Sequence, residues 1–179
     1  MRIHITGASG TGTTTLGQAL AAVLNLVHLD GDAYYWLPTQ PPFKVKRQAV
    51  ERHAALRSDL HKIPDLVLSG SIVGWGADLE DAFDLVVFLY VIAELRVERL
   101  RNREIQRCGV ADPEFLEWAQ QYDEGPREGR SLAKHSVWLS ERACPVLRLE
   151  GDLSVAERIR RICQALPNAS LGARPSLGY

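Results

Sequence analysis

Short apolar runs alternate with longer helix-like stretches along the chain, in the manner of βαβ units. We expect five strands, over residues 2–6, 26–30, 66–70, 84–91 and 146–149. We expect helices over about 13–24, 46–62, 93–107, 113–122, 131–141 and 154–166. The fourth strand is apolar after its first residue, as a strand buried on both faces requires. This alternation predicts an α/β fold, in which helices cover both faces of a parallel sheet.

Two segments lack the regularity of core elements. Residues 34–46 are rich in proline and aromatic residues, and residues 108–130 contain Gly-Val-Ala-Asp-Pro and Glu-Gly-Pro-Arg-Glu-Gly. We expect one domain over residues 1–167, with a substrate lobe at about 31–62 and a lid at about 94–131. Residues 168–179 are expected to form a loose tail, because Pro, Gly, Ser and Asn occur there without periodicity.

Composition places the chain among ordinary globular proteins. It has 179 residues, of which 46% are hydrophobic and 24% charged. A chain of this length and composition builds one good core. The formal net charge of -1 provides no overall field for a polyanion such as duplex DNA, so we expect no nucleic-acid partner.

The sequence has the features of a cytoplasmic protein. Its longest apolar stretch, residues 85–93, falls far short of the roughly 20 residues that span a bilayer. We therefore expect no membrane partner, and the N-terminus lacks the features of a signal peptide. Three widely spaced cysteines form no C-x-x-C pair, which is typical of reduced thiols. We expect a monomer or a homodimer.

A glycine-rich loop follows the first strand and opens a helix. The stretch Gly7-Ala8-Ser9-Gly10-Thr11-Gly12-Thr13-Thr14 matches G-x-x-x-x-G-K-[ST] everywhere except at position 13. Glycines in such a loop let successive N–H groups converge on phosphate oxygens, and the helix N-terminus adds partial positive charge. The predicted phosphate-binding residues are Gly7, Ser9, Gly10, Thr11, Gly12, Thr13, Thr14 and Thr15. The alternative is a capping turn whose hydroxyls satisfy the helix N-terminus.

Thr13 stands where lysine is expected in this loop. That lysine normally follows the charge on the β- and γ-phosphates, in charge-assisted contacts worth about 1.5–3 kcal/mol. Thr14 keeps the hydroxyl that ligates Mg²⁺, and Thr15 lies beside it. Phosphate and Mg²⁺ binding are therefore expected, but another group must supply the missing cation.

The strand, the loop and the helix together resemble those of the small P-loop kinases, of the adenylate-kinase and shikimate-kinase types. The resemblance covers nearly the whole chain. It implies a three-layer fold with a five-stranded parallel sheet of order 2-3-1-4-5. It also implies lobes after the second and fourth strands, where the two irregular segments fall, as well as ATP, Mg²⁺ and a small-molecule acceptor.

Two aspartates end the second strand, in His28-Leu29-Asp30-Gly31-Asp32. Both carboxylates are thereby placed at the carboxyl edge of the sheet, where ligands bind in open α/β folds. By resemblance to the shikimate-kinase type of site, Asp30 would hold Mg²⁺ and Asp32 would orient or deprotonate an acceptor hydroxyl. The alternative is an Asx turn or a helix cap beyond the strand.

The third strand ends in Leu68-Ser69-Gly70-Ser71, whereas many relatives have aspartate at the position of Ser69. Ser69 can offer the metal only a hydroxyl or a water contact, so Thr14 and Asp30 are the predicted ligands. Gly70 and Trp75 are candidates for the substrate site, although a packing role suits Trp75 equally well.

Four arginines recur at spacings of three, four and four on one face of the helix expected after the fourth strand. They are Arg96, Arg99, Arg103 and Arg107. By resemblance, such arginines stabilise the transferring phosphoryl group or stack on adenine, and Arg99 and Arg103 are the best matches. Arginine could also replace the lost lysine. The alternative is a solvated basic face.

Further candidates lie in the irregular segments and after the last strand. Arg127 and Arg130 belong to the expected lid and are candidates for the substrate site. Tyr34 and Trp36 could hold a ring of the acceptor by stacking, or could form a hydrophobic clasp. The loop with Gly151 and Asp152 resembles the adenine-side loop of the kinases.

Three functions fit these features. The first is a Mg²⁺-dependent kinase that moves the γ-phosphoryl group of ATP to a nucleotide or a hydroxyl metabolite. The second is a degenerate module that binds ATP without efficient transfer, which Thr13 and Ser69 favour. A simple nucleoside triphosphatase ranks lowest, because the irregular lobes resemble machinery that excludes water.

Overall fold

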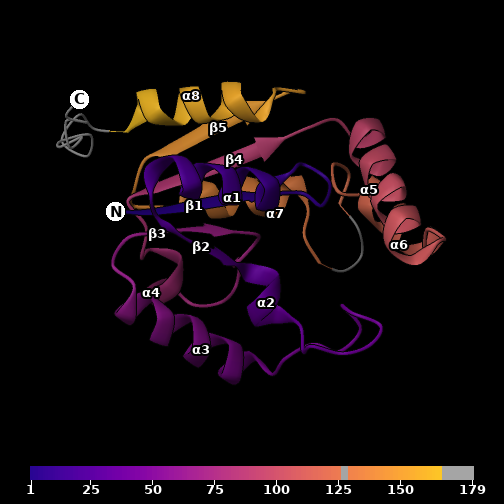
Figure 1. Ribbon diagram of the computed structural model, residues 1–179, viewed down its shortest axis with the longest axis horizontal. Coiled ribbons are helices and arrows are strands. Elements are labelled where there is room, and N and C mark those ends of the chain that lie inside the picture. The colour runs from indigo at the N-terminus through magenta and orange to yellow at the C-terminus, as the bar shows by residue number, and fades with distance from the viewer. Residues whose placement is uncertain (126–128, 167–179) are drawn as a thin grey trace, which may run out of the picture.

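A parallel sheet forms the centre of the protein, which a computed structural model describes over residues 1–125 and 129–166 (Figure 1). Its strands lie in the order β2-β3-β1-β4-β5, and every neighbouring pair is parallel. They are β1 (Arg2–Gly7), β2 (Val27–Asp30), β3 (Leu66–Ser69), β4 (Leu85–Tyr90) and β5 (Val146–Glu150). The expected α/β fold and its strand order are confirmed.

The helices follow the strands in the order of βαβ units. They are α1 (Thr13–Leu24), α2 (Gly31–Tyr35), α3 (Ala49–Lys62), α4 (Ala77–Glu80), α5 (Ala93–Cys108), α6 (Pro113–Gln120), α7 (Leu132–Ser140) and α8 (Val155–Ala165). Six of them match expected helices to within a few residues at each end. The sequence analysis missed α2 and α4, because segments of five and four residues are too short to show a helical period.

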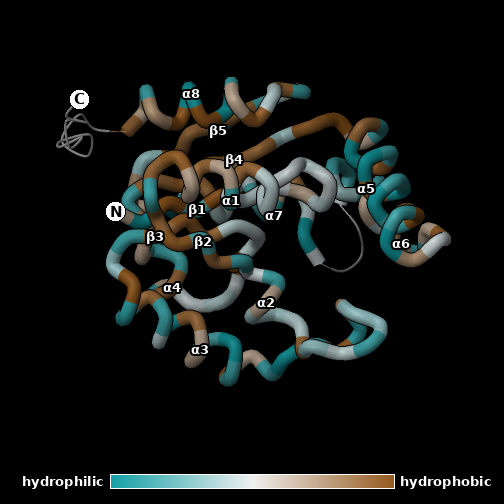
Figure 2. Tube along the Cα trace, in the orientation of Figure 1, coloured by the Kyte–Doolittle hydropathy of each residue, from teal (hydrophilic) through white to brown (hydrophobic). Residues whose placement is uncertain are grey.

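Two hydrophobic layers cover the sheet. One cluster joins Leu16 and Leu20 of α1 and Ile162 of α8 to one face. The other joins Leu56 of α3 and Trp138 of α7 to the opposite face. Successive residues of β4 alternate between the two clusters, so this strand is buried on both sides. Figure 2 accordingly shows the central strands as hydrophobic.

Helices α5 and α6 lie beyond the carboxyl edge of the sheet and pack mainly on each other (Figure 1). A small hydrophobic cluster of their own, around Leu100 and Leu116, joins them. Figure 2 shows α5 as mostly hydrophilic, which fits a helix at the edge of the molecule. Residues 126–128 of the expected lid, including Arg127, and the expected tail over 168–179 lie outside the described residues.

Arg96 anchors this pair of helices to the sheet. Its side chain is fully buried. It donates to Val91 O at 2.8 Å, to Ala119 O at 2.9 Å and to Asp123 Oδ2 at 3.1 Å. Its guanidinium also lies 5.0 Å from the centroid of the Tyr122 ring. Arg96 therefore has a structural role.

We predict that Arg96→Met lowers the free energy of unfolding by about 3–5 kcal/mol, because it leaves the Asp123 carboxylate and two carbonyl groups without their donor. Urea denaturation measures the loss. Arg101→Met, which removes an exposed arginine from the same helix, is the matched control. Equal midpoints for the two variants would show that the Arg96 contacts carry no stability.

Candidate active site

The loop between β1 and α1 is shaped by close backbone contacts. A Cβ atom at Gly7 would lie 2.6 Å from Leu89 O, and one at Gly10 would lie 2.6 Å from Arg96 O. Gly10 also has a φ of 85°, in the left-handed region that favours glycine. The buried Thr11 closes the loop from within, since its Oγ1 donates to Ala8 O at 2.8 Å. Only glycine fits at the two tightest positions.

No side chain caps the N-terminus of α1. Gly12 occupies the N-cap position, and α1 has no side-chain cap hydrogen bond. Two nearby hydroxyls are engaged elsewhere, that of Thr11 with the loop itself and that of Thr14 with Asp30. The first amides of the helix are therefore available to an anion. This geometry favours a phosphate site over the capping turn that the sequence left open.

Thr14 and Asp30 meet at the start of α1 and the end of β2. Thr14 Oγ1 donates to Asp30 Oδ2 at 3.1 Å. The other oxygen of Asp30 accepts from the N–H of Asp32 at 3.0 Å and caps α2. The Asp30 carboxylate therefore caps α2 and also lies at the position expected of a metal ligand.

This oxygen pair suits Mg²⁺, which keeps several waters and takes one or two carboxylates in kinase sites. Within the described part of the chain, no group of three or more His, Cys, Asp or Glu could hold a metal by itself. Ser69 is buried and its hydroxyl lies 3.0 Å from His28 Nε2. Thr15 is exposed on the surface of α1, and Thr13 is half-buried.

Asp32 is exposed to solvent and lies in a charged environment beside Asp30. Desolvation is the largest cause that raises the pKa of its carboxyl group, and the charge of Asp30 adds to it. Arg130, Arg103 and a hydrogen bond with the Trp36 side chain act in the opposite direction. The net result is a carboxylate whose pKa is higher than usual, at the position predicted for a base.

The arginines near the loop have different partners. Arg130 Nη2 donates to Ser9 Oγ at 3.3 Å. Arg99 forms an ion pair with Asp152 and donates from Nη1 to Gly10 O at 3.4 Å. Arg103 is exposed and lies 3.4 Å from a carboxylate oxygen of Glu104. The structure thus brings Arg99, Arg130 and Asp152 to the loop, whereas Arg103 acts on the charge of Asp32 and Arg107 is exposed near the end of α5.

The aromatic residues after Asp32 form a cluster with the loop that follows β3. The buried Trp75 stacks on Tyr35, with ring centroids 6.3 Å apart, and Tyr35 contacts Trp36 edge-on at 4.8 Å. Arg52, which the sequence analysis missed, places its guanidinium 5.1 Å from the Tyr35 ring and 5.0 Å from the Trp75 ring. Trp75 is thus a packing residue of this cluster. Tyr34 is set apart, since its hydroxyl donates to Asp59 at 2.7 Å.

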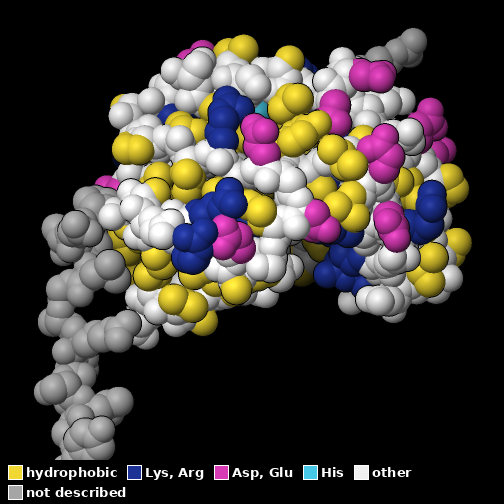
Figure 3. Space-filling model, turned by 90° about the horizontal axis from the view of Figure 1, so that it is seen from above, with side chains coloured by type: hydrophobic (Ala, Val, Ile, Leu, Met, Phe, Trp, Pro, Cys, Tyr) yellow, Lys and Arg dark blue, Asp and Glu magenta, His cyan; other side chains and the backbone are white. Residues whose placement is uncertain are grey.

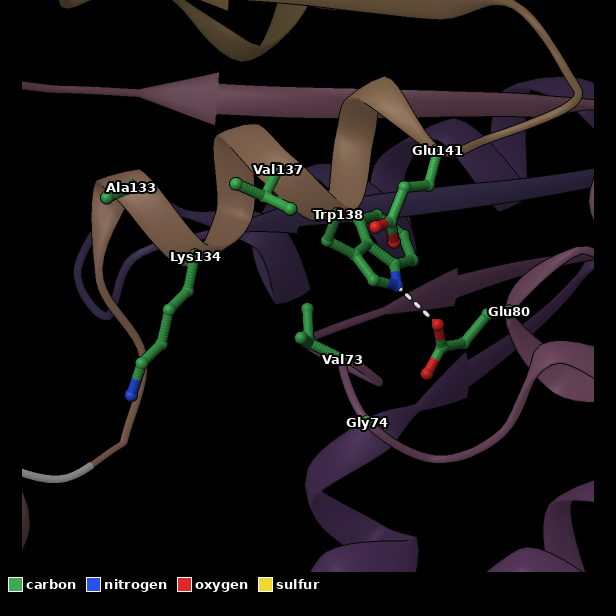
Figure 4. A pocket seen from close by; sticks show the side chains of 8 residues that line it. All are labelled: Val73, Gly74, Glu80, Ala133, Lys134, Val137, Trp138 and Glu141. Atoms are coloured by element: carbon green, nitrogen blue, oxygen red, sulfur yellow. Dashed lines mark hydrogen bonds between the residues drawn. The ribbon is translucent and has the colours of Figure 1, made fainter.

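Buried polar groups hold the segment from Gly70 to Gly76 in place. His4 Nε2 donates to Gly70 O at 2.7 Å, and burial lowers the pKa of His4 to about 4, so this ring is neutral. Glu80 accepts from the N–H groups of Trp75 and Gly76 at 2.8 and 3.2 Å, and from Trp138 Nε1 at 2.7 Å. Figure 4 shows Glu80 and Trp138 facing each other beside a shallow, mainly apolar hollow under α7.

Arg158 of α8 is a second residue that the sequence analysis missed. It is 3% exposed, and its Nη1 donates to Thr11 O at 2.8 Å. A signal was present in the sequence, because Arg158 shares the helical spacing of Val155 and Ile162, on the face that α8 turns to the core. An arginine at a core position of an amphipathic helix indicates a specific partner.

The visible surface shows no extended patch of one charge. In Figure 3, basic and acidic side chains alternate over the face that carries α8. This pattern agrees with the net charge of -1. None of the helices in the described ranges is long and apolar enough to cross a membrane.

Comparison with known proteins assigns the chain to a family. A family model described as "AAA domain" matches residues 3–114. The chain belongs to this AAA domain family. The chain is also 46% identical over 174 residues to "Uncharacterized protein YqaC" of Bacillus subtilis (strain 168), a match that covers 92% of this chain and 96% of that protein.

Solved structures of kinases share the fold of this chain. A shikimate kinase from Acinetobacter baumannii, in complex with shikimate, superposes with a TM-score of 0.59 at 17% identity, covering 92% of this chain and 91% of the other. A gluconokinase from Sinorhizobium meliloti 1021 gives 0.54 at 19% identity, covering 89% and 87%. These likenesses confirm the small P-loop kinase fold that the sequence resembles.

We predict that Asp32→Asn slightly stabilises the protein above neutral pH, by a small amount because Asp32 is exposed and solvent screens its charge. Because the pKa of Asp32 is raised in the folded state, its ionised form costs stability at every pH above that pKa. The advantage of the Asn variant should shrink as the pH falls through the raised pKa, and vanish below the ordinary range of aspartate. Thermal unfolding between pH 4 and 8 is the measurement.

Asp78→Asn is the control of opposite sign. A hydrogen bond with His53 lowers the pKa of Asp78, so its ionised form stabilises the folded state. This variant should lose stability at neutral pH, and the loss should fade as the pH falls. A destabilised Asp32→Asn variant at neutral pH would contradict the environment described for Asp32.

Proposed function

We propose that this protein is a Mg²⁺-dependent kinase that transfers the γ-phosphoryl group of ATP to a small acceptor. The observation that carries the proposal is that no side chain caps the N-terminus of α1, which follows a loop whose path requires glycine. Asp30 and Asp32 lie nearby at the end of β2. The kinase fold of the neighbouring structures supports it. The acceptor belongs to one of two classes, nucleotides or hydroxyl metabolites.

The loop residues and Asp30 have distinct roles in this proposal. Backbone N–H groups between Gly7 and Thr14 bind the phosphates. Thr14 and Asp30 hold Mg²⁺, which neutralises charge on the phosphate oxygens when it is bound. Gly151 and Asp152 lie on the nucleobase side of the loop, where Arg99 reaches both Asp152 and Gly10.

Asp32 is the proposed base. The acceptor oxygen forms a bond to the γ-phosphorus, the bond from that phosphorus to the bridging oxygen of ADP breaks, and the acceptor proton passes to Asp32. A carboxylate with a raised pKa suits this task, because a stronger base takes the proton more readily. Arg130, which contacts Ser9 from the side of the lid, is positioned to meet negative charge on the transferred group or the acceptor.

The acceptor would lie between Asp32 and the aromatic cluster. Of the residues predicted for the substrate site, Trp36 and Gly70 would border this region, whereas Trp75 packs inside the cluster and Tyr34 is bound to Asp59. Arg52 lies against the Tyr35 and Trp75 rings of the cluster. The aromatic rings favour a planar or cyclic acceptor, while Arg52 and Arg130 favour one that carries negative charge.

We predict that Asp32→Asn lowers the rate of transfer by at least about 100-fold while ATP still binds, because only the base is removed. Labelled ATP with Mg²⁺, offered to a panel of nucleotides and hydroxyl metabolites, identifies the acceptor and measures the rate. Asp78→Asn, on α4, removes an exposed carboxylate and serves as the control.

A binding module without transfer is the second candidate, and Thr13 favours it. Its signature is saturable ATP binding with no phosphorylation of any acceptor, in both the wild type and the Asp32→Asn variant. A wild type that releases phosphate equally well with and without acceptors would instead indicate a triphosphatase.

A further inference from the structure

Arg158 differs from the other buried arginines in its partners. Arg96 pairs with Asp123, and the buried side chain of Arg142 pairs with Glu80 and Asp81. Arg158 is as deeply buried, yet no carboxylate of the described residues lies within 4.0 Å of it. Burying a charged group without a counter-ion costs free energy of folding. The buried guanidinium of Arg158 therefore calls for an anion from outside the chain.

The guanidinium of Arg158 lies directly behind the phosphate loop. It donates to Thr11 O at 2.8 Å and to Gly151 O at 3.3 Å, and its Nε is buried with no partner among the described residues. A Cβ atom at Gly12 would lie 3.5 Å from its Nη1. The bond to Thr11 O polarises the Thr11–Gly12 peptide, whose N–H belongs to the loop that faces the phosphates.

The charge behind the loop is only partly balanced. Burial lowers the pKa of Arg158, the like charge of Arg99 adds to this effect, and Asp152 offsets part of it. Asp152 is the direct ion-pair partner of Arg99, so two cations share one carboxylate. A polyphosphate in the loop would supply the missing negative charge.

We propose that Arg158 is the fixed cation of the phosphate site, acting through the Thr11–Gly12 peptide in place of the lysine that Thr13 replaces. Arg158 is then a positioning residue, since it reaches the ligand through the backbone. This inference rests on the proposed function only in requiring that the loop binds a nucleoside polyphosphate. Transfer itself plays no part in it.

The test compares variants that separate charge from hydrogen bonding. Arg158→Gln keeps a donor near Thr11 O without the charge, whereas Arg158→Lys keeps the charge. We expect Arg158→Gln to weaken Mg·ATP binding by about tenfold, in line with the loss of one charge-assisted contact. Arg158→Lys should stay within about threefold of the wild type. Arg161→Gln, on the exposed face of α8, is the matched control and should bind as the wild type does.

Rescue by Thr13→Lys distinguishes an electrostatic role from a structural one. If Arg158 supplies the missing charge, Thr13→Lys should restore Mg·ATP affinity in the Arg158→Gln background and improve it much less in the wild type. Calorimetric titration of the full chain is made at a temperature where every variant is folded, with unfolding midpoints recorded alongside.

Three outcomes would overturn the inference. They are an Arg158→Gln variant that binds Mg·ATP like the wild type, an equal gain from Thr13→Lys in both backgrounds, and an Arg158→Lys variant weakened about tenfold. The Arg158→Lys result decides against the inference even if the Arg158→Gln variant does not fold. A wild type that binds no Mg·ATP would overturn the proposed function as well, so the two failures are distinguishable.

Discussion

The approach of the Gly7 backbone to the Leu89 carbonyl is the contact on which the site depends. β1 pairs with β4 up to Gly7 and Leu89, and a Cβ atom at Gly7 would lie 2.6 Å from Leu89 O. Because β1 pairs with β4 to its last residue, the loop begins close to the end of β4 and the start of α5. The Gly10 backbone then packs against Arg96. Because Gly7 and Gly10 lack side chains, the loop before α1 packs closely against β4 and α5.

This packing places positively charged side chains around the loop. Arg99 and Arg158 donate to the carbonyls of Gly10 and Thr11, while Arg130 reaches Ser9. The first two lie outside the loop and donate to its carbonyl groups, and the third comes from the segment just before α7. The chain therefore surrounds its loop with arginines that belong to three separate segments. The positive charge that a lysine would place inside the loop is spread over its outer side.

The sequence predicted the fold well, because the fold depends on features that are local in the chain. Apolar runs located the strands, and the glycine spacing located the loop. The elements it missed are α2 and α4, which are stabilised by single side chains. Asp30 caps α2, and Glu80 binds the N–H groups of Trp75 and Gly76 before α4. Such short elements depend on tertiary contacts that leave no periodic signal.

The sequence predicted some residues of the candidate site and missed others. Asp30 and Thr14 meet as expected, because the carboxyl ends of β1 and β2 lie at the same edge of the sheet. The roles of the four arginines on α5 could not be predicted from their spacing, because the arginines have different surroundings. Arg96 is buried, whereas Arg103 is exposed. The role of Arg158 depends on α8 crossing behind the loop, at a distance of 147 residues from Thr11. Contacts over such distances in sequence cannot be inferred from spacing.

A crystal structure with Mg²⁺ and a non-hydrolysable ATP analogue tests the central claim most directly. The account predicts that the phosphates lie within the loop from Gly7 to Thr14, with Mg²⁺ near Thr14 and Asp30 and the γ-phosphate on the side of Asp32. An analogue bound elsewhere, with the loop amides facing only water, would contradict it.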